Sequence, residues 1–173
     1  MKKLAYLICL PALLISSCTK HYNCCTVAQP TAKVTAEKNG TGWSPTYAGG
    51  ILSSQDSLSI SATGASYEAS VYKKVDTFNI KIKYNTPGTY QLKSGQAFYG
   101  VFTNNTLTKG YQLDESYNNV INITGHERLS NPNSSAPDEV KISGTFSLKF
   151  IDPNNPGGIT FQSGSFYALV PYL

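Results

Sequence analysis

One cysteine near the N-terminus stands in a pattern that predicts covalent lipid attachment. The lysines Lys2-Lys3 precede an apolar run from Leu4 to Ile15, and the small pair Ser16-Ser17 comes directly before Cys18. These are the three parts of a secretory signal, and the Cys18 thiol could take a diacylglycerol and, with it, acyl chains such as palmitate. The apolar run is shorter than the roughly 20 residues of a membrane span. We therefore interpret residues 1–17 as a lipoprotein signal peptide and Cys18 as the lipidated residue, in preference to a signal peptide cut elsewhere or a membrane-spanning anchor.

Two further cysteines follow closely and invite a comparison with metal sites. Cys24 and Cys25 are adjacent and lie near His21. Such a pair could form a strained vicinal disulfide, link two chains, or bind a metal together with the histidine. A convincing zinc site has a second, spaced pair of ligands, which is missing here. We predict no metal site and no cofactor.

The residues that could serve a hydrolase are dispersed along the chain. His126 is the only histidine after the N-terminal region, and no Gly-x-Ser-x-Gly elbow is present to expose an activated serine. Two carboxylates could meet in space as in a glycosidase, although the acidic residues are scattered over expected turns and strand edges. The pairs Asp114-Glu115 and Asp138-Glu139 are more typical of solvated loop ends than of calcium ligands. We predict that the protein is not an enzyme.

Tyrosines are the remaining candidates for recognition. Those on an exposed sheet face could stack on sugar rings or anchor a protein partner, although tyrosines that bridge the core and water are the commoner case. The candidate set is Tyr67, Tyr72, Tyr99, Tyr111, Tyr117 and Tyr167.

Alternating apolar and polar residues predict the strands that must position these groups. The clearest alternation runs from Val140 to Phe150, and shorter ones cover Leu58–Ala62 and Phe78–Tyr84. In residues 159–170 the apolar phase changes around Gly164, which predicts a β-bulge. Residues 97–102 are apolar on both faces, so we expect that strand to be deeply buried.

Turn residues separate these strands throughout. Asn39-Gly40, Asn104-Asn105 and the stretches 85–88 and 152–158 have turn composition, and 130–138 is the most polar, proline-broken connection. No segment has a convincing helical period. We therefore predict an all-β fold of about eight to ten strands, either an antiparallel β-sandwich or a closed antiparallel β-barrel.

The chain has the length of one domain with short N-terminal segments. Residues 18–31 lack periodicity and end near Gln29-Pro30, so we interpret them as a flexible tether, followed by a single β-domain over residues 32–173. The formal net charge is +4, and half of it comes from Lys2-Lys3. The other basic residues are scattered, which argues against a nucleic-acid partner.

Several short motifs, taken in order, resemble a known group of proteins. They are Asn39–Trp43, Gly88–Leu92, Ile142–Ser147, Ile159–Phe161 and Ser163–Phe166. Together they are similar to the uncharacterised lipoprotein domains common in Bacteroidetes. That family has no established activity, so the resemblance bears on localisation and all-β architecture and supplies no catalytic residue.

The resemblance also bears on sorting and modification. Surface-exposed lipoproteins of that group tend to carry acidic residues after the lipidated cysteine, and residues 19–23 contain none. We expect an outer-membrane lipoprotein that faces the periplasm. These bacteria attach glycans at Asp-Ser/Thr-apolar sites, and Asp56-Ser57-Leu58 is similar to one, which makes Ser57 a candidate for glycosylation.

The leading hypothesis is a non-enzymatic, lipid-anchored module of the cell envelope with a binding or structural role. Its expected partners are the membrane, through the N-terminal lipid, and an envelope protein or a glycan. A glycan-binding accessory lipoprotein is the alternative, and a hydrolase that uses dispersed carboxylates is less favoured.

Overall fold

The computed structural model describes residues 32–53, 56–68, 71–129 and 139–171. The expected signal peptide and tether, with Cys18, His21, Cys24 and Cys25, lie outside these residues, as does the connection 130–138. Across the described residues the chain is all-β, and no helix in them is long and apolar enough to cross a membrane. The strands are β1 (Ala32–Lys38), β2 (Thr41–Trp43), β3 (Tyr47–Ser53), β4 (Ser57–Glu68), β5 (Val71–Lys83), β6 (Gly88–Gln91), β7 (Ala97–Thr103), β8 (Thr106–Leu113), β9 (Val120–Leu129), β10 (Glu139–Asp152) and β11 (Asn155–Pro171).

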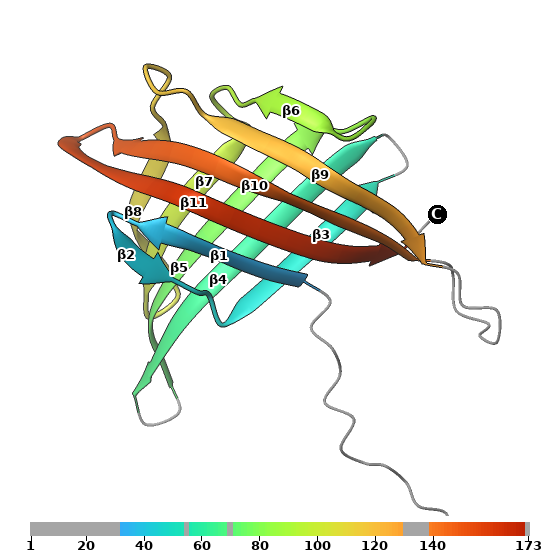
Figure 1. Ribbon diagram of the computed structural model, residues 1–173. Coiled ribbons are helices and arrows are strands. Elements are labelled where there is room, and N and C mark those ends of the chain that lie inside the picture. The colour runs from blue at the N-terminus through green and yellow to red at the C-terminus, as the bar shows by residue number, and fades with distance from the viewer. Residues whose placement is uncertain (1–31, 54–55, 69–70, 130–138, 172–173) are drawn as a thin grey trace, which may run out of the picture.

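These eleven strands form a single antiparallel sheet that curls strongly into a half-barrel (Figure 1). The main path runs β2-β1-β11-β10-β8-β7-β5-β4-β3. Strand β10 divides the sheet, because Glu139–Ser147 pairs with β9 while Phe150 and Ile151 pair with β8. Strand β6 then extends the β9 side. The prediction of an antiparallel sandwich or barrel is confirmed, with one strand more than the upper end of the expected range.

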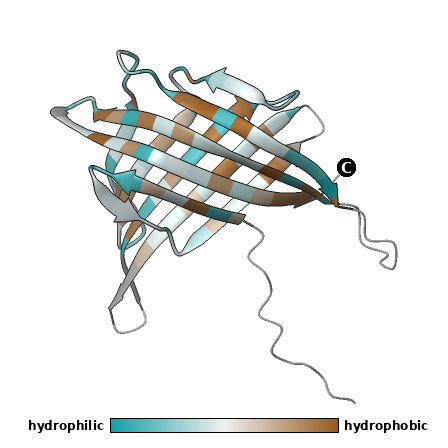
Figure 2. Cartoon of the chain, viewed as in Figure 1, coloured by the Kyte–Doolittle hydropathy of each residue, from teal (hydrophilic) through white to brown (hydrophobic). Residues whose placement is uncertain are grey.

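The alternating sequences produce the expected burial. Along β10 the six apolar or small residues at even positions from Val140 to Phe150 are buried, and the pattern repeats in β4 and β5. Figure 2 displays this alternation as hydrophobic and hydrophilic bands along the strands. Phe78, Phe150 and Phe161 form an aromatic group in the core, with ring centroids 5.3 to 6.2 Å apart. These geometries are in the range that stabilises aromatic pairs.

The sheet closes partly on itself where β3 meets β11. Strands β2 and β3 end opposite sides of the sheet order although only residues 44–46 separate them in the chain. A methyl group on Gly50 of β3 would lie 2.3 Å from the Cβ of Ala168 of β11. Gly50 of β3 therefore packs closely against the side chain of Ala168 of β11, and the described residues of these two strands form no hydrogen-bonded ladder with each other.

Two local expectations had different outcomes. The register of β11 shifts near Ser163, whose φ is +49°, so the predicted bulge beside Gly164 is confirmed. The deep burial predicted for residues 97–102 is wrong for Phe98, which is 38% exposed while Tyr99 is fully buried. Alternate residues of a strand lie on opposite faces, so Phe98 lies on the outer face of the curled sheet, where its ring covers Gly100, while Ala97 and Tyr99 are buried on the inner face.

The short turns agree with the sequence. Asn39 and Gly40 join β1 to β2 with φ of +49° and +75°, and Asn104 and Asn105 join β7 to β8 with φ of +49° and +63°. Two consecutive positive φ angles are typical of type I′ hairpins, whose twist matches that of the strands. The turn expected over residues 152–158 is shorter, because β11 already begins at Asn155.

Candidate functional site

A pocket of about 730 Å³ lies at one end of the half-barrel. Its walls come from β1, β2, β4, β5, β7, β8 and β11 and from the connection between β2 and β3. Figure 1 shows where these strands lie in the half-barrel. Most of the lining residues on the strands continue the inward-facing phase beyond the point where the apolar core ends. On β5 the inward series Ile82, Ile80, Phe78 continues as Asp76 and Lys74. The pocket is therefore the polar end of the barrel interior.

The same change from apolar to polar residues occurs on the neighbouring strands. On β1 the buried residues Val34 and Ala36 are followed by Lys38, and on β8 Leu113 and Tyr111 are followed by Lys109. Because alternate residues of a strand share one face, this phase could have been followed in the sequence. None of these lysines is among the candidates predicted from the sequence.

A hydrogen-bonded cluster around Asp76 forms the base of the pocket. The carboxylate oxygen Oδ2 accepts from Lys38 Nζ at 2.8 Å, from Trp43 Nε1 at 3.1 Å and from the Tyr99 hydroxyl at 3.1 Å. Lys38 Nζ also donates to the Tyr99 hydroxyl and lies 4.8 Å from the centre of its ring. Four strands thus contribute one polar side chain each to a single network.

Burial and charge keep the Tyr99 phenol protonated. The pKa of Tyr99 is raised well above its usual range, first by burial and then by the negative charge and hydrogen bond of Asp76. A neutral phenol can donate to a carboxylate. Tyr99 is therefore a fixed donor in the pocket and not a proton-transfer group at neutral pH.

The second carboxylate oxygen of Asp76 has a different environment. Among the residues that the structure describes, Oδ1 has no hydrogen-bond partner, and it is not sealed from solvent. It lies against the backbone of Gly64, where a methyl group would come within 2.2 Å of it. The glycine therefore makes room for a carboxylate oxygen that remains able to accept a hydrogen bond.

The rim of the pocket is basic and rich in hydroxyl groups. Of the described residues, Lys38, Lys74 and Lys109 line it together with Asp76, which is the one carboxylate among them. The side chains of Lys74 and Lys109 are exposed, in line with their position at the end of the barrel. Hydroxyl groups come from Ser44, Thr46, Thr103 and Thr108.

The expected candidates mostly lie elsewhere. His126 is within β9, where its Nδ1 is 2.6 Å from the Tyr84 hydroxyl and its ring stacks on that of Tyr84 at 5.8 Å. The pKa of Tyr84 is raised by burial and by the nearby Tyr90. Ser57 is the first residue of β4, where it is half-buried and pairs with Ser53 of β3 and Lys83 of β5.

The tyrosines do not form an exposed platform in the described part of the chain. Tyr99 and Tyr111 are buried and line the pocket, while Tyr117 and Tyr167 are half-buried. The side chains of Tyr67 and Tyr72 lie outside what the structure describes. Within the described ranges, no three His, Cys, Asp or Glu residues come together as metal ligands.

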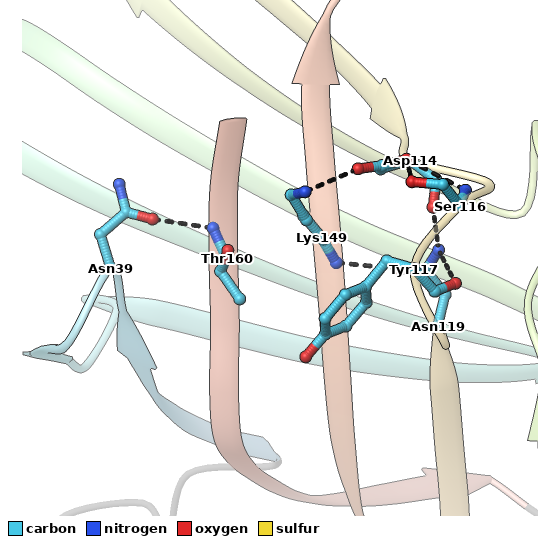
Figure 3. Close-up of polar contacts among 7 residues, drawn as sticks. All are labelled: Asn39, Asp114, Ser116, Tyr117, Asn119, Lys149 and Thr160. Atoms are coloured by element: carbon cyan, nitrogen blue, oxygen red, sulfur yellow. Dashed lines mark hydrogen bonds and ion pairs between the residues drawn. The ribbon is translucent and has the colours of Figure 1, made fainter. Parts of the chain in front are cut away.

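Asp114 has a structural role that the sequence analysis missed. It was expected at a solvated loop end, but only 7% of it is exposed. Its Oδ2 lies 2.9 Å from Lys149 Nζ, and its Oδ1 accepts from the backbone N–H and the hydroxyl of Ser116 (Figure 3). The hydrogen bonds to Lys149 and Ser116 lower the pKa of Asp114 to about 2. Glu115 is exposed, as expected.

Two asparagines complete the attachments that hold these loops (Figure 3). Asn119 Nδ2 donates to the carbonyl of Asp114 at 2.7 Å, and its Oδ1 accepts from the N–H of Lys149 at 2.8 Å. Asn39 Oδ1 accepts from the N–H of Thr160 at 2.8 Å. The first attachment fixes the β8–β9 connection to β10, and the second fixes the β1–β2 hairpin, and with it the strand of Trp43, to β11.

Comparison with known proteins gives a family and no activity. No curated protein and no solved structure matches the chain significantly. A family profile described as a domain of unknown function, DUF6252, matches residues 30–170, which covers nearly all of the described β-domain. The chain therefore belongs to the DUF6252 family.

Proposed function

We propose that the protein is a lipid-anchored binding module of the outer membrane, with its ligand site in the pocket at the polar end of the half-barrel. The observation that carries this proposal is the change of the inward-facing residues from apolar to polar along several strands. A barrel that only had to be stable could end in apolar side chains or a packed loop. Here the interior instead ends in an accessible set of charged and hydroxyl groups.

The arrangement supports binding better than hydrolysis. A glycosidase uses two carboxylates, one of them as acid, whereas Asp76 is the one carboxylate among the described residues that line the pocket. Three donors already occupy its Oδ2. Such a carboxylate is well suited to hold a ligand hydroxyl group and poorly suited to act as a nucleophile.

The membrane assignment rests on the sequence. The lipobox ending at Cys18 and the resemblance to Bacteroidetes lipoprotein domains support an anchor in the outer membrane. The lack of acidic residues after Cys18 supports a periplasm-facing domain. Protease added to intact cells should then spare the protein, and lysis should make it accessible; loss on intact cells would instead place the domain on the cell surface.

Site-specific photo-crosslinking in cells tests the binding role. Thr103 is exposed at the pocket rim, and Glu127 is exposed on β9, away from the pocket. With a photoreactive benzoylphenylalanine at position 103, we expect an adduct of an envelope protein or glycan. The same group at position 127 is the control and should give none. Equal adducts at both positions, or none at position 103, would contradict a ligand site in the pocket.

A further inference from the structure

We infer that the outer face of the sheet carries a second binding site, centred on Phe98 of β7, for a neutral polysaccharide chain. This face is on the other side of the sheet from the pocket, so the inference goes beyond the proposed function. It starts from an exposed aromatic ring that lies between two amide side chains on the neighbouring strands.

Two facing glycines make room for the ring of Phe98. Gly100 of β7 pairs with Gly110 of β8, and a methyl group on Gly100 would lie 2.7 Å from both Cε1 and Cζ of Phe98. A methyl group on Gly110 would lie 3.7 Å from Cε2 of the same ring. The phenyl ring therefore leans along the sheet over both glycines. Glycine in the interior of a strand often marks a place where a ligand approaches closely.

The ring is open to solvent from outside, within a small apolar area. Phe98 is 38% exposed and the adjoining Leu107 is 47% exposed. Even with the half-buried Phe102 and Val75 beside Leu107, this area comprises four side chains. A stable protein–protein interface takes about 20 residues or more from each partner. The area is instead suited to a sugar, whose C–H face packs on an aromatic ring.

Amide side chains flank the ring on both sides. Asn79 of β5 and Gln112 of β8 are the direct cross-strand partners of Phe98. Among the residues that the structure describes, neither amide group has a hydrogen-bond partner. Adjacent strands are spaced so that the backbones of the two amides lie about 10 Å apart, with the ring between them. Because each amide both donates and accepts, the pair can bind hydroxyl groups at both edges of a sugar that packs on the ring.

The outward side chains around the ring are polar without charge. Thr77 of β5 and Thr63 of β4 lie opposite each other, and Ser61 pairs with Asn79, so hydroxyl groups continue the site across two further strands. Lys81, two positions beyond Asn79, is the first charged residue on this face of β5 in that direction. A neutral chain rich in hydroxyl groups matches this surface. An acidic chain would place its charges on side chains that offer no compensating positive charge.

Isothermal titration calorimetry on the purified full-length lipidated protein, in detergent, tests this site. The probes are cellohexaose, xylohexaose and mannohexaose, with an oligogalacturonate of equal length as the acidic comparison. We expect saturable binding of at least one neutral chain and weaker binding of the acidic one. Fluorescence of Trp43, which is the only tryptophan and lines the pocket, should stay unchanged at saturation, because the chain binds on the other face.

Substitutions around the ring locate the interaction. The N79A/Q112A double variant removes both amides and should weaken binding about tenfold, as expected for two lost hydrogen bonds. Phe98→Leu keeps an apolar cover over Gly100 but removes the ring, and should weaken binding by about the same factor. Phe98→Tyr keeps the ring and should bind like the wild type. Gln162→Ala is the matched control, because Gln162 is an exposed amide on β11, and it should leave the affinity unchanged. Urea denaturation verifies that each variant is folded.

Three results would overturn the inference: no binding of any neutral chain, equal binding of the acidic chain, or unchanged affinity in both N79A/Q112A and Phe98→Leu. Binding that survives these variants and changes the emission of Trp43 would belong to the pocket, and would support the proposed function alone. If no sugar binds and a photoreactive group at position 112 captures a second copy of the chain or another envelope protein, the outer face is a protein interface. Crosslinking at position 103 tests the pocket independently of these outcomes.

Discussion

At the scale of single residues, Asp76 organises the pocket through the different environments of its two oxygens. Oδ2 joins Lys38, Trp43 and Tyr99 into one network, while Oδ1 remains available beside Gly64. A partly buried carboxylate is tolerated because charged and neutral donors surround it. This residue therefore links the stability of the barrel end to the chemistry that the end can offer a ligand.

Gly64→Ala should disturb this arrangement. The added methyl would lie 2.2 Å from Asp76 Oδ1, so the carboxylate has to move. Overpacking of this kind typically costs about 1–3 kcal/mol of unfolding free energy. Urea denaturation measures this loss, and a shift in Trp43 emission should report the altered pocket. Gly42→Ala is the control, because nothing lies within 4 Å of a methyl there; an equal effect of both changes would contradict the close contact.

Asp114→Asn should change how stability depends on pH. The pKa of Asp114 is about 2 in the folded protein, below the ordinary 3.8, because the hydrogen bonds to Lys149 and Ser116 favour the charged form. Its stabilising contribution is therefore complete above the ordinary pKa and is lost as the pH falls towards 2. Urea midpoints measured between pH 5 and pH 2 should fall less steeply in the variant than in the wild type. Glu115→Gln should retain the wild-type slope, and an unchanged slope in Asp114→Asn would contradict the assigned pKa.

The sequence predicted the burial of residues that follow the apolar–polar alternation of a strand better than that of residues that interrupt the alternation. The buried positions of β10 follow directly from alternation, whereas Asp114 continues no apolar phase, and its partner Lys149 lies 35 positions away in the chain. The pocket lysines could be placed on the inward face by counting, but their convergence depends on which strands are neighbours. That information is long-range and is not contained in any local pattern.

At the scale of elements, the sequence predicted the strands and several turns but not their pairing. Asn39-Gly40 and Asn104-Asn105 adopt the positive φ angles that their composition favours. The position of β10 between β8 and β9 depends on the Asp114–Asn119 connection, whose hydrogen bonds hold β8 and β9 to different parts of β10. Phe98 was wrongly predicted to be buried, because the composition of an apolar strand does not indicate which of its two faces is exposed to solvent.

The contact between β3 and β11 gives a test at this scale. Gly50→Ala should place a methyl 2.3 Å from the Cβ of Ala168 and destabilise the fold by about 1–3 kcal/mol. Ala168→Gly alone should cost about 1 kcal/mol, because it removes a buried methyl and adds backbone freedom. The double variant G50A/A168G exchanges the methyl across the interface and should recover part of the loss.

Denaturation of the wild type and the three variants completes a double-mutant cycle. A favourable coupling between the two positions is expected if the edge of the sheet packs as described. Strict additivity of the two changes would indicate that β3 and β11 are not in direct contact.

At the scale of the whole molecule, the half-barrel has an apolar interior that becomes polar at one end, together with a modest net charge of +4 over the full sequence. Because the net charge is small, the protein as a whole has only a weak electrostatic field. We therefore expect ligand binding in the pocket to depend on direct contacts more than on long-range electrostatic attraction of the ligand. The domain also carries its site on several strands, and a rigid scaffold of this kind holds a site more precisely than loops do. A short tether of residues 18–31 would keep this site close to the membrane.

Cys18→Ala tests the membrane anchor on which this arrangement depends. The alanine lacks the thiol that takes the lipid, so the variant should incorporate no labelled palmitate and should move from the membrane fraction to the soluble fraction. Cys24→Ala is the matched control, because it removes a thiol six positions further along the chain and should keep both the label and the membrane association. An unlipidated variant that stays in the membrane fraction would show that another part of the protein holds it there. A membrane-bound Cys18→Ala protein that still incorporates palmitate would move the lipid to a different residue and end the lipobox interpretation.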